Sequence, residues 1–133
     1  MSMKTTVTLT SILTLSTFLA ATAAPDLSKL PPASSKTGLT YAKDIKPIFE
    51  KSCFKCHGAE KQKAKLRLDS IEAVLKGSEN GEVVAKGDSK KSSMVVAVAR
   101  LDDDSAMPPE GKGEPLTKDQ VGLIRAWIDQ GAK

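Results

Sequence analysis

The chain has 133 residues, a formal net charge of +4, two cysteines and one histidine. Its lysines are interleaved with acidic residues, which predicts a solvated surface and excludes a nucleic-acid-binding protein. Only 4% of the residues are aromatic, so a single small domain is expected to need a further apolar group to complete its core.

Residues 1–23 are predicted to be a signal peptide. Lys4 supplies the positive charge, residues 7–20 form an apolar stretch, and Ala21-Thr22-Ala23 is a small-x-small cleavage site. The apolar stretch is short for a membrane span, which needs roughly 20 residues. Cleavage after Ala23 removes Lys4, lowers the formal charge from +4 to +3 and leaves no membrane span. The alternative is an uncleaved N-terminal anchor helix.

Residues 24–39 are rich in Pro, Ser and Lys and predict a flexible leader before a domain at residues 40–133. The apolar residues after Thr40 have helical spacing and predict a helix of about three turns that ends near Cys53. Pro47 fits this helix only if its regular part begins near Asp44 or if the helix bends there.

Residues 58–65 are polar and predict a loop. Residues 70–76 predict a short helix that Gly77 ends. A third helix is expected to begin after Asp88 or Ser92 and to continue through Leu101, because its apolar residues again have helical spacing.

Residues 102–115 predict a long Pro/Gly loop. Thr117 and Gln120 then form a capping box, which predicts a last helix that Gly131 ends. The fold class is therefore expected to be mostly α, with the first and last helices crossing.

Cys53-Phe54-Lys55-Cys56-His57 is a C-x-x-C-H motif. Two thiols at this spacing can add to the two vinyl groups of one haem, and the histidine is then held as an axial ligand of the iron. The motif predicts one covalent haem c, attached through Cys53 and Cys56 with His57 on its iron. Covalent haem attachment normally takes place outside the cytoplasm, which agrees with the predicted export and a periplasmic location.

The second axial ligand has two sulfur candidates in the exported chain. Met94 belongs to an apolar helical stripe, where methionine more often fills the core. Met107 lies in a loop before Pro108-Pro109, where the stiff backbone suits a ligand, so Met107 is the predicted ligand. A lysine ligand and an open sixth position remain as alternatives.

Two further residues are candidates for the haem propionates. Arg67 can pair with a propionate, and its alternative is a solvated side chain. Trp127 can donate its indole N–H to a propionate, and its alternative is a core aromatic at the helix crossing.

Methionine opposite histidine raises the reduction potential and suits electron transfer. The expected function is therefore a monomeric, non-enzymatic periplasmic carrier of single electrons between redox proteins. The lysines at 55, 61, 63 and 65 could steer docking onto an acidic partner. The alternatives are a gas sensor or small peroxidase with an open distal site, a thiol-redox or metal-binding module, and a bound subunit of a larger redox complex.

An ordered series of motifs resembles the planctomycete-type cytochrome c domain, a branch of the class I-like c-type cytochromes. The resemblance covers Tyr41 to Ala132 and rests on these segments: Ile45-Lys46-Pro47-Ile48, Cys53 to Gly58, Leu66-Arg67-Leu68-Asp69, Gly87-Asp88 with Ser93, Met107-Pro108-Pro109, Leu116-Thr117 and Trp127 to Ala132.

The resemblance implies the cytochrome c fold, haem attachment at Cys53 and Cys56, His57 as proximal ligand and Met107 as distal ligand. Two departures concern loops: Lys65 stands where the family usually has Gly, and Lys86-Gly87-Asp88-Ser89 replaces a Pro-Gly-Asp-Pro turn. They put the local turn geometry in question, not haem binding.

Overall fold

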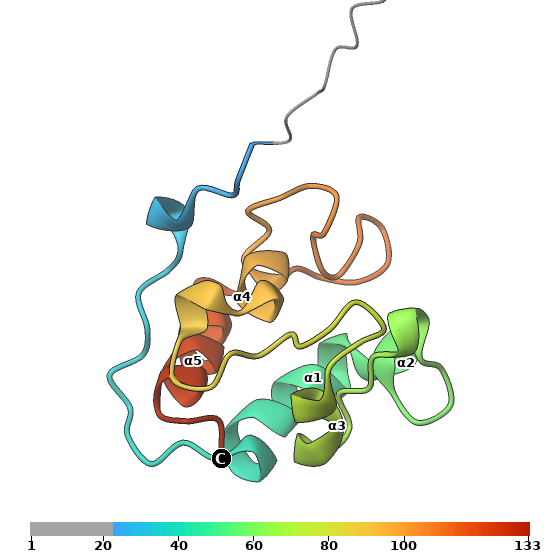
Figure 1. Ribbon diagram of the computed structural model, residues 1–133, viewed down its shortest axis with the longest axis horizontal. Coiled ribbons are helices and arrows are strands. Elements are labelled where there is room, and N and C mark those ends of the chain that lie inside the picture. The colour runs from blue at the N-terminus through green and yellow to red at the C-terminus, as the bar shows by residue number, and fades with distance from the viewer. Residues whose placement is uncertain (1–22) are drawn as a thin grey trace, which may run out of the picture.

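The computed structural model describes residues 23–133, so the predicted signal peptide lies outside the described residues except for Ala23. The described chain is helical and contains no strand, only two isolated bridges, and the mostly-α prediction is confirmed (Figure 1). The elements in chain order are the short helix η1 (Leu27–Lys29), the π-turn η2 (Tyr41–Ile45), α1 (Lys46–Ser52), α2 (Phe54–His57), η3 (Lys63–Lys65), α3 (Ile71–Lys76), η4 (Ser89–Lys91), α4 (Ser93–Val98) and α5 (Lys118–Asp129). Within residues 23–133, none of the helices combines the length and apolar character that a bilayer crossing requires.

The first helical segment starts as a π-turn and continues as an α-helix. The Thr40 side chain accepts a hydrogen bond from the Lys43 amide and caps η2. The α-helix begins at Lys46, which places Pro47 in its first turn, where the missing N–H has no cost. Of the two alternatives expected for Pro47, the structure shows a regular helix that begins close to Asp44, at Lys46.

The last helix forms the centre of the core. Thr117 and Gln120 make both bonds of the predicted capping box at the start of α5. Its inner face buries Ile124, Trp127 and Ile128 completely. The Trp127 ring packs against Tyr41 of η2 with 6.1 Å between ring centroids, so the first and last helical segments meet at this pair.

The middle helices are short. Ser70 caps α3 and Gly77 follows its end with φ +81°, as predicted. The helix α4 ends at Val98, earlier than the predicted Leu101, because Arg100 adopts φ +55° and reverses the chain.

The structure shows how the chain forms the two loops in which it departs from the family pattern. Lys65 adopts φ +54°, the left-handed conformation that glycine adopts most readily. Gly87 has φ +84°, and the Asp88 carboxylate accepts the amides of Lys90 and Lys91, so a capped turn forms without the two prolines.

The leader, predicted to be flexible, lies along the outer side of α5 (Figure 1). The Ser34 amide donates to the Gly122 carbonyl (2.9 Å), and Gln130 accepts from the Leu39 amide while donating to the Lys36 carbonyl. Arg125 is only 8% exposed, and its guanidinium donates to the Pro31 carbonyl. These bonds satisfy main-chain groups of the leader. From the composition of a flexible leader, the same groups would be expected to bond to water.

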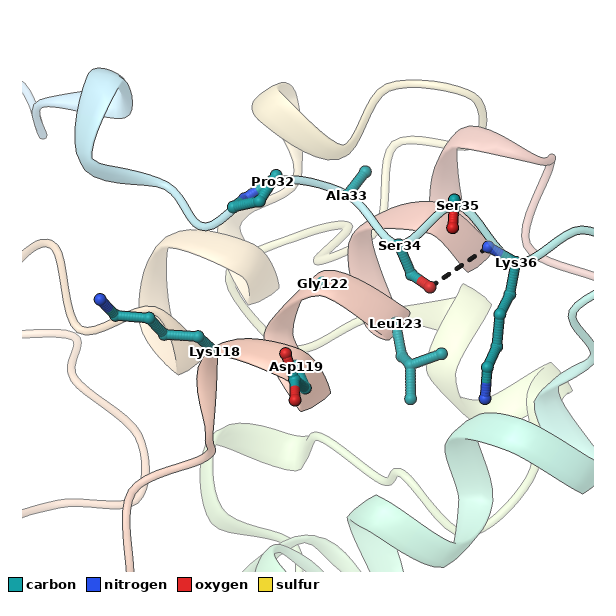
Figure 2. A pocket seen from close by; sticks show the side chains of 9 residues that line it. All are labelled: Pro32, Ala33, Ser34, Ser35, Lys36, Lys118, Asp119, Gly122 and Leu123. Carbon is teal, nitrogen blue, oxygen red and sulfur yellow. Dashed lines mark hydrogen bonds between the residues drawn. The ribbon is translucent and has the colours of Figure 1, made fainter.

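The leader and the first turns of α5 together line a groove (Figure 2), and Gly122 lies where the two segments meet. A Cβ at Gly122 would lie 2.8 Å from the Pro32 carbonyl oxygen. Main-chain atoms cannot move aside as a flexible side chain can, so a residue without a side chain is needed where the leader crosses the helix.

Replacing Gly122 by Ala is expected to release the leader. Alanine has a higher helix propensity than glycine, by up to about 1 kcal/mol, so the substitution by itself stabilises α5. Its Cβ would clash with Pro32, and this clash should loosen the leader. Limited proteolysis should cut residues 31–36 faster in Gly122→Ala than in the wild type. Lys118→Ala, an exposed change on the same helix, is the control, and equal cleavage of both variants would contradict the prediction.

Candidate functional site

Cys53 joins α1 to α2, and the other four residues of the C-x-x-C-H motif form α2, a single helical turn. The Cys53 amide donates to Phe49 at the end of α1, and the Cys53 carbonyl accepts both the Cys56 amide (3.0 Å) and the His57 amide (2.9 Å). The two cysteines are half-buried and not disulfide-bonded. The turn therefore holds both thiols and the imidazole on a single rigid segment.

Burial, with a smaller effect from Cys56, raises the pKa of the Cys53 thiol to about 11. At neutral pH this thiol is protonated, whereas the attacking thiols of C-x-x-C oxidoreductases have lowered pKa values. A protonated thiol is a poor nucleophile, so the environment of Cys53 disfavours dithiol exchange.

His57 carries the clearest sign of a missing interaction. Its Nδ1 atom is buried and has no hydrogen-bond partner within the described residues. An unpaired buried nitrogen is uncommon and costs free energy. Two unpaired thiols beside an imidazole with an unmet polar atom fit a covalently bound haem, with His57 available to its iron.

The segment after the motif is held against the core. Gly58 follows His57, and a Cβ there would lie 2.4 Å from the Phe54 carbonyl oxygen, so only glycine fits. The His57 carbonyl accepts the Leu68 amide (2.8 Å), and the Leu68 carbonyl accepts the Tyr41 hydroxyl. Tyr41 thus links the turn that carries His57 to the aromatic core.

The two methionine candidates lie in different environments. Met94 is 6% exposed and belongs to the hydrophobic core, as expected for a core-filling residue. Met107 is half-buried in the loop before α5, and its amide donates to the Ala97 carbonyl (2.9 Å). Met107 remains the predicted distal ligand.

The two propionate candidates already have protein partners. Arg67 makes a two-pronged pair with Asp69, with N–O distances of 2.9 and 2.6 Å. The indole N–H of Trp127, a fully buried side chain, donates to the Lys133 carbonyl (2.9 Å). The structure places Trp127 as a core aromatic, and a propionate contact from Arg67 remains a prediction.

Sequence reasoning missed two residues at this site. Tyr41 was assigned only to an apolar helix face, and nothing local signals that its hydroxyl reaches Leu68, 27 positions away. Arg100 was not singled out, yet its guanidinium donates to the Pro108 carbonyl next to Met107. Its only sequence signal is an arginine at the predicted helix end, shortly before Met107-Pro108-Pro109.

The family model described as Planctomycete cytochrome C matches residues 53–111. This segment begins at the first haem-motif cysteine and includes Met107, and the match confirms the resemblance identified from the sequence. No curated protein and no solved structure matches the chain.

Removal of the Tyr41 hydroxyl should change how stability depends on pH. Burial, followed by the charge of Asp69, raises the pKa of Tyr41 from 10.0 to about 12. Its neutral hydroxyl therefore stabilises the fold fully below about pH 10, and this stabilisation is lost as the pH rises towards about 12. Tyr41→Phe should lower the free energy of unfolding by about 1 kcal/mol or more at neutral pH.

Denaturant unfolding of both proteins across this pH range is the measurement. The difference in unfolding free energy should shrink above pH 10, whereas lysine ionisation is common to both proteins and cancels. A difference that stays constant up to about pH 12 would show that the hydroxyl is not held as described.

Proposed function

The planctomycete cytochrome c match over residues 53–111 is the premise from which we propose a periplasmic electron carrier with one covalent haem c. The observation that carries the proposal is the rigid turn that presents two unpaired thiols beside a His57 ring with an unmet buried nitrogen. The residues between Met1 and Ala23 support export, because they have the composition of a signal peptide.

In this proposal each residue has a definite task. Cys53 and Cys56 would hold the haem through thioethers, and His57 and Met107 would ligate its iron. When bound, the haem supplies a one-electron redox couple, whose potential a thioether ligand raises. The helical turn that begins at Cys53 holds the three motif side chains together, which limits rearrangement between oxidation states.

The charge distribution supports an acidic redox partner. Residues 51–65 surround the haem motif and contain five lysines and one glutamate, all exposed, and we call this segment the basic lobe. Residues 102–114, the acidic loop, contain five acidic residues and one lysine. Figure 1 shows the basic lobe and the acidic loop projecting from the end of the molecule opposite the leader.

Opposite charges on two segments at one end give the molecule an oriented field. The positive pole of this field lies at the basic lobe, so an approaching acidic surface is attracted to the basic lobe and repelled by the acidic loop. We therefore propose that the basic lobe docks onto an acidic patch of a redox protein, with electrons passing near Cys53 and Cys56.

Replacing Met107 by Leu tests the ligation. The oxidised wild type should show low-spin bands, a methionine-to-iron charge-transfer band and no change with carbon monoxide after reduction. Met107→Leu should lose the charge-transfer band, bind carbon monoxide and have a lower potential, because a vacated position opens to exogenous ligands.

Met94→Leu is the matched control, since it removes a buried sulfur atom and nearly conserves the volume of the side chain. It should keep the wild-type spectrum and potential. A wild-type spectrum in Met107→Leu would refute ligation by Met107, and carbon monoxide binding by the wild type would favour the open-site sensor or peroxidase.

Charge reversal in the basic lobe tests the docking surface. Lys61→Glu with Lys63→Glu should slow oxidation of the reduced protein by the anion ferricyanide roughly tenfold at low salt. The effect should fade as salt screens the charges.

The control is Lys36→Glu with Lys118→Glu, the same change in net charge beside the groove of Figure 2. Equal slowing by the two double variants would mean that only net charge matters, and the basic lobe would then not be the docking surface.

A further inference from the structure

The end of α4 contains an arginine where a glycine is expected. The Leu101 amide donates to the Val96 carbonyl (3.2 Å) and the Arg100 amide to the Ala97 carbonyl (3.1 Å). This pair of bonds is the Schellman ending of a helix, whose left-handed residue is usually glycine. Here Arg100 occupies that position with φ +55°. A side chain kept in a strained conformation suggests a task for the side chain.

The Arg100 side chain acts on the loop that contains Met107. Its half-buried guanidinium donates to the Pro108 carbonyl, directly after Met107. The Met107 amide donates to the Ala97 carbonyl (2.9 Å), which also accepts the Arg100 amide. The end of α4 therefore holds the main chain on both sides of Met107.

A surface ion pair does not explain the arginine. The four ion pairs found within residues 23–133 do not include Arg100. A guanidinium directed at a carbonyl makes a charge-assisted hydrogen bond, which is stronger than one between neutral groups. This is the strongest side-chain anchor that the described structure gives to the Met107-Pro108-Pro109 segment.

We infer that Arg100 is a positioning residue that holds Met107 in place as the distal ligand. The inference rests on the proposed function, because it assumes that Met107 binds the iron. It predicts that a substitution at this position can lower the backbone strain and at the same time weaken the anchoring of the Met107 loop. Glycine at residue 100 relieves the left-handed backbone, but it removes the anchor on Pro108.

The experiment compares Arg100→Gly, Arg100→Lys and the control Lys65→Gly in the haem-loaded protein. Lys65 is a second cation in the left-handed region, with φ +54°, but it is exposed, and its side chain pairs with Glu79 and not with the Met107 loop. Both glycine variants remove a positive charge and relieve the same kind of backbone strain.

Three quantities are measured: hydrogen exchange at the Met107 amide, the methionine-to-iron charge-transfer band, and the affinity for added imidazole. Arg100→Gly should speed exchange at Met107 and raise imidazole affinity, each roughly tenfold, as expected for loss of a hydrogen bond from a charged group. It should weaken the charge-transfer band without lowering the thermal midpoint. Arg100→Lys should restore part of each effect. Lys65→Gly should leave these three quantities as in the wild type, because none of them measures docking at the basic lobe.

The outcomes separate the inference from the proposed function. If Arg100→Gly leaves the charge-transfer band and imidazole affinity unchanged while Met107→Leu abolishes the band, Met107 is the ligand and the inference about Arg100 is overturned. If Met107→Leu also leaves the band unchanged, the proposed ligation fails and the inference fails with it. Equal effects of Arg100→Gly and Lys65→Gly would assign the change to charge or backbone and would also overturn it.

Discussion

The contact between Tyr41 and Trp127 is the constraint on which the rest of the structure depends. Tyr41 packs its ring on Trp127 and Phe49, with centroid distances of 6.1 and 6.3 Å, and donates its hydroxyl to Leu68. Leu68 in turn donates to the carbonyl of His57. A single side chain therefore joins the last helix, the first helical segment and the turn that carries the C-x-x-C-H motif, so the packing of the core also sets the position of the site.

The two sides of the candidate site are held by different means. The His57 side rests on a tight helical turn, on Gly58 pressed against the Phe54 carbonyl, and on Tyr41. The Met107 side is a long loop anchored to the end of α4 by a main-chain bond and the guanidinium of Arg100. A loop with few anchors opens more readily than a helix packed in the core. This difference is why one side chain at the end of α4 can matter for a distal ligand.

The leader packs on the face of α5 that points away from the basic lobe. Arg125 connects it to the domain, because its buried guanidinium donates both to the Pro31 carbonyl and to Ser89 Oγ. Ser89 also bonds the Asp129 carboxylate. The leader, η4 and α5 are therefore joined through one polar network, and the end of the molecule that carries the haem motif and the acidic loop is left uncovered by the leader.

Features that depend only on neighbouring residues could be predicted from the sequence. The C-x-x-C-H spacing, the capping box at Thr117 and the helix stop at Gly77 are local patterns, and each was predicted because its geometry involves only a few successive residues. The packed fold sets the other contacts: the hydrogen bond of the Trp127 indole, the bond from the Tyr41 hydroxyl to Leu68, the bond from Arg100 to Pro108, and the docking of the leader on Gly122. These depend on contacts between segments distant in the chain or on a backbone reversal, and a polar side chain's partner is set by which group the packed core brings within hydrogen-bond distance.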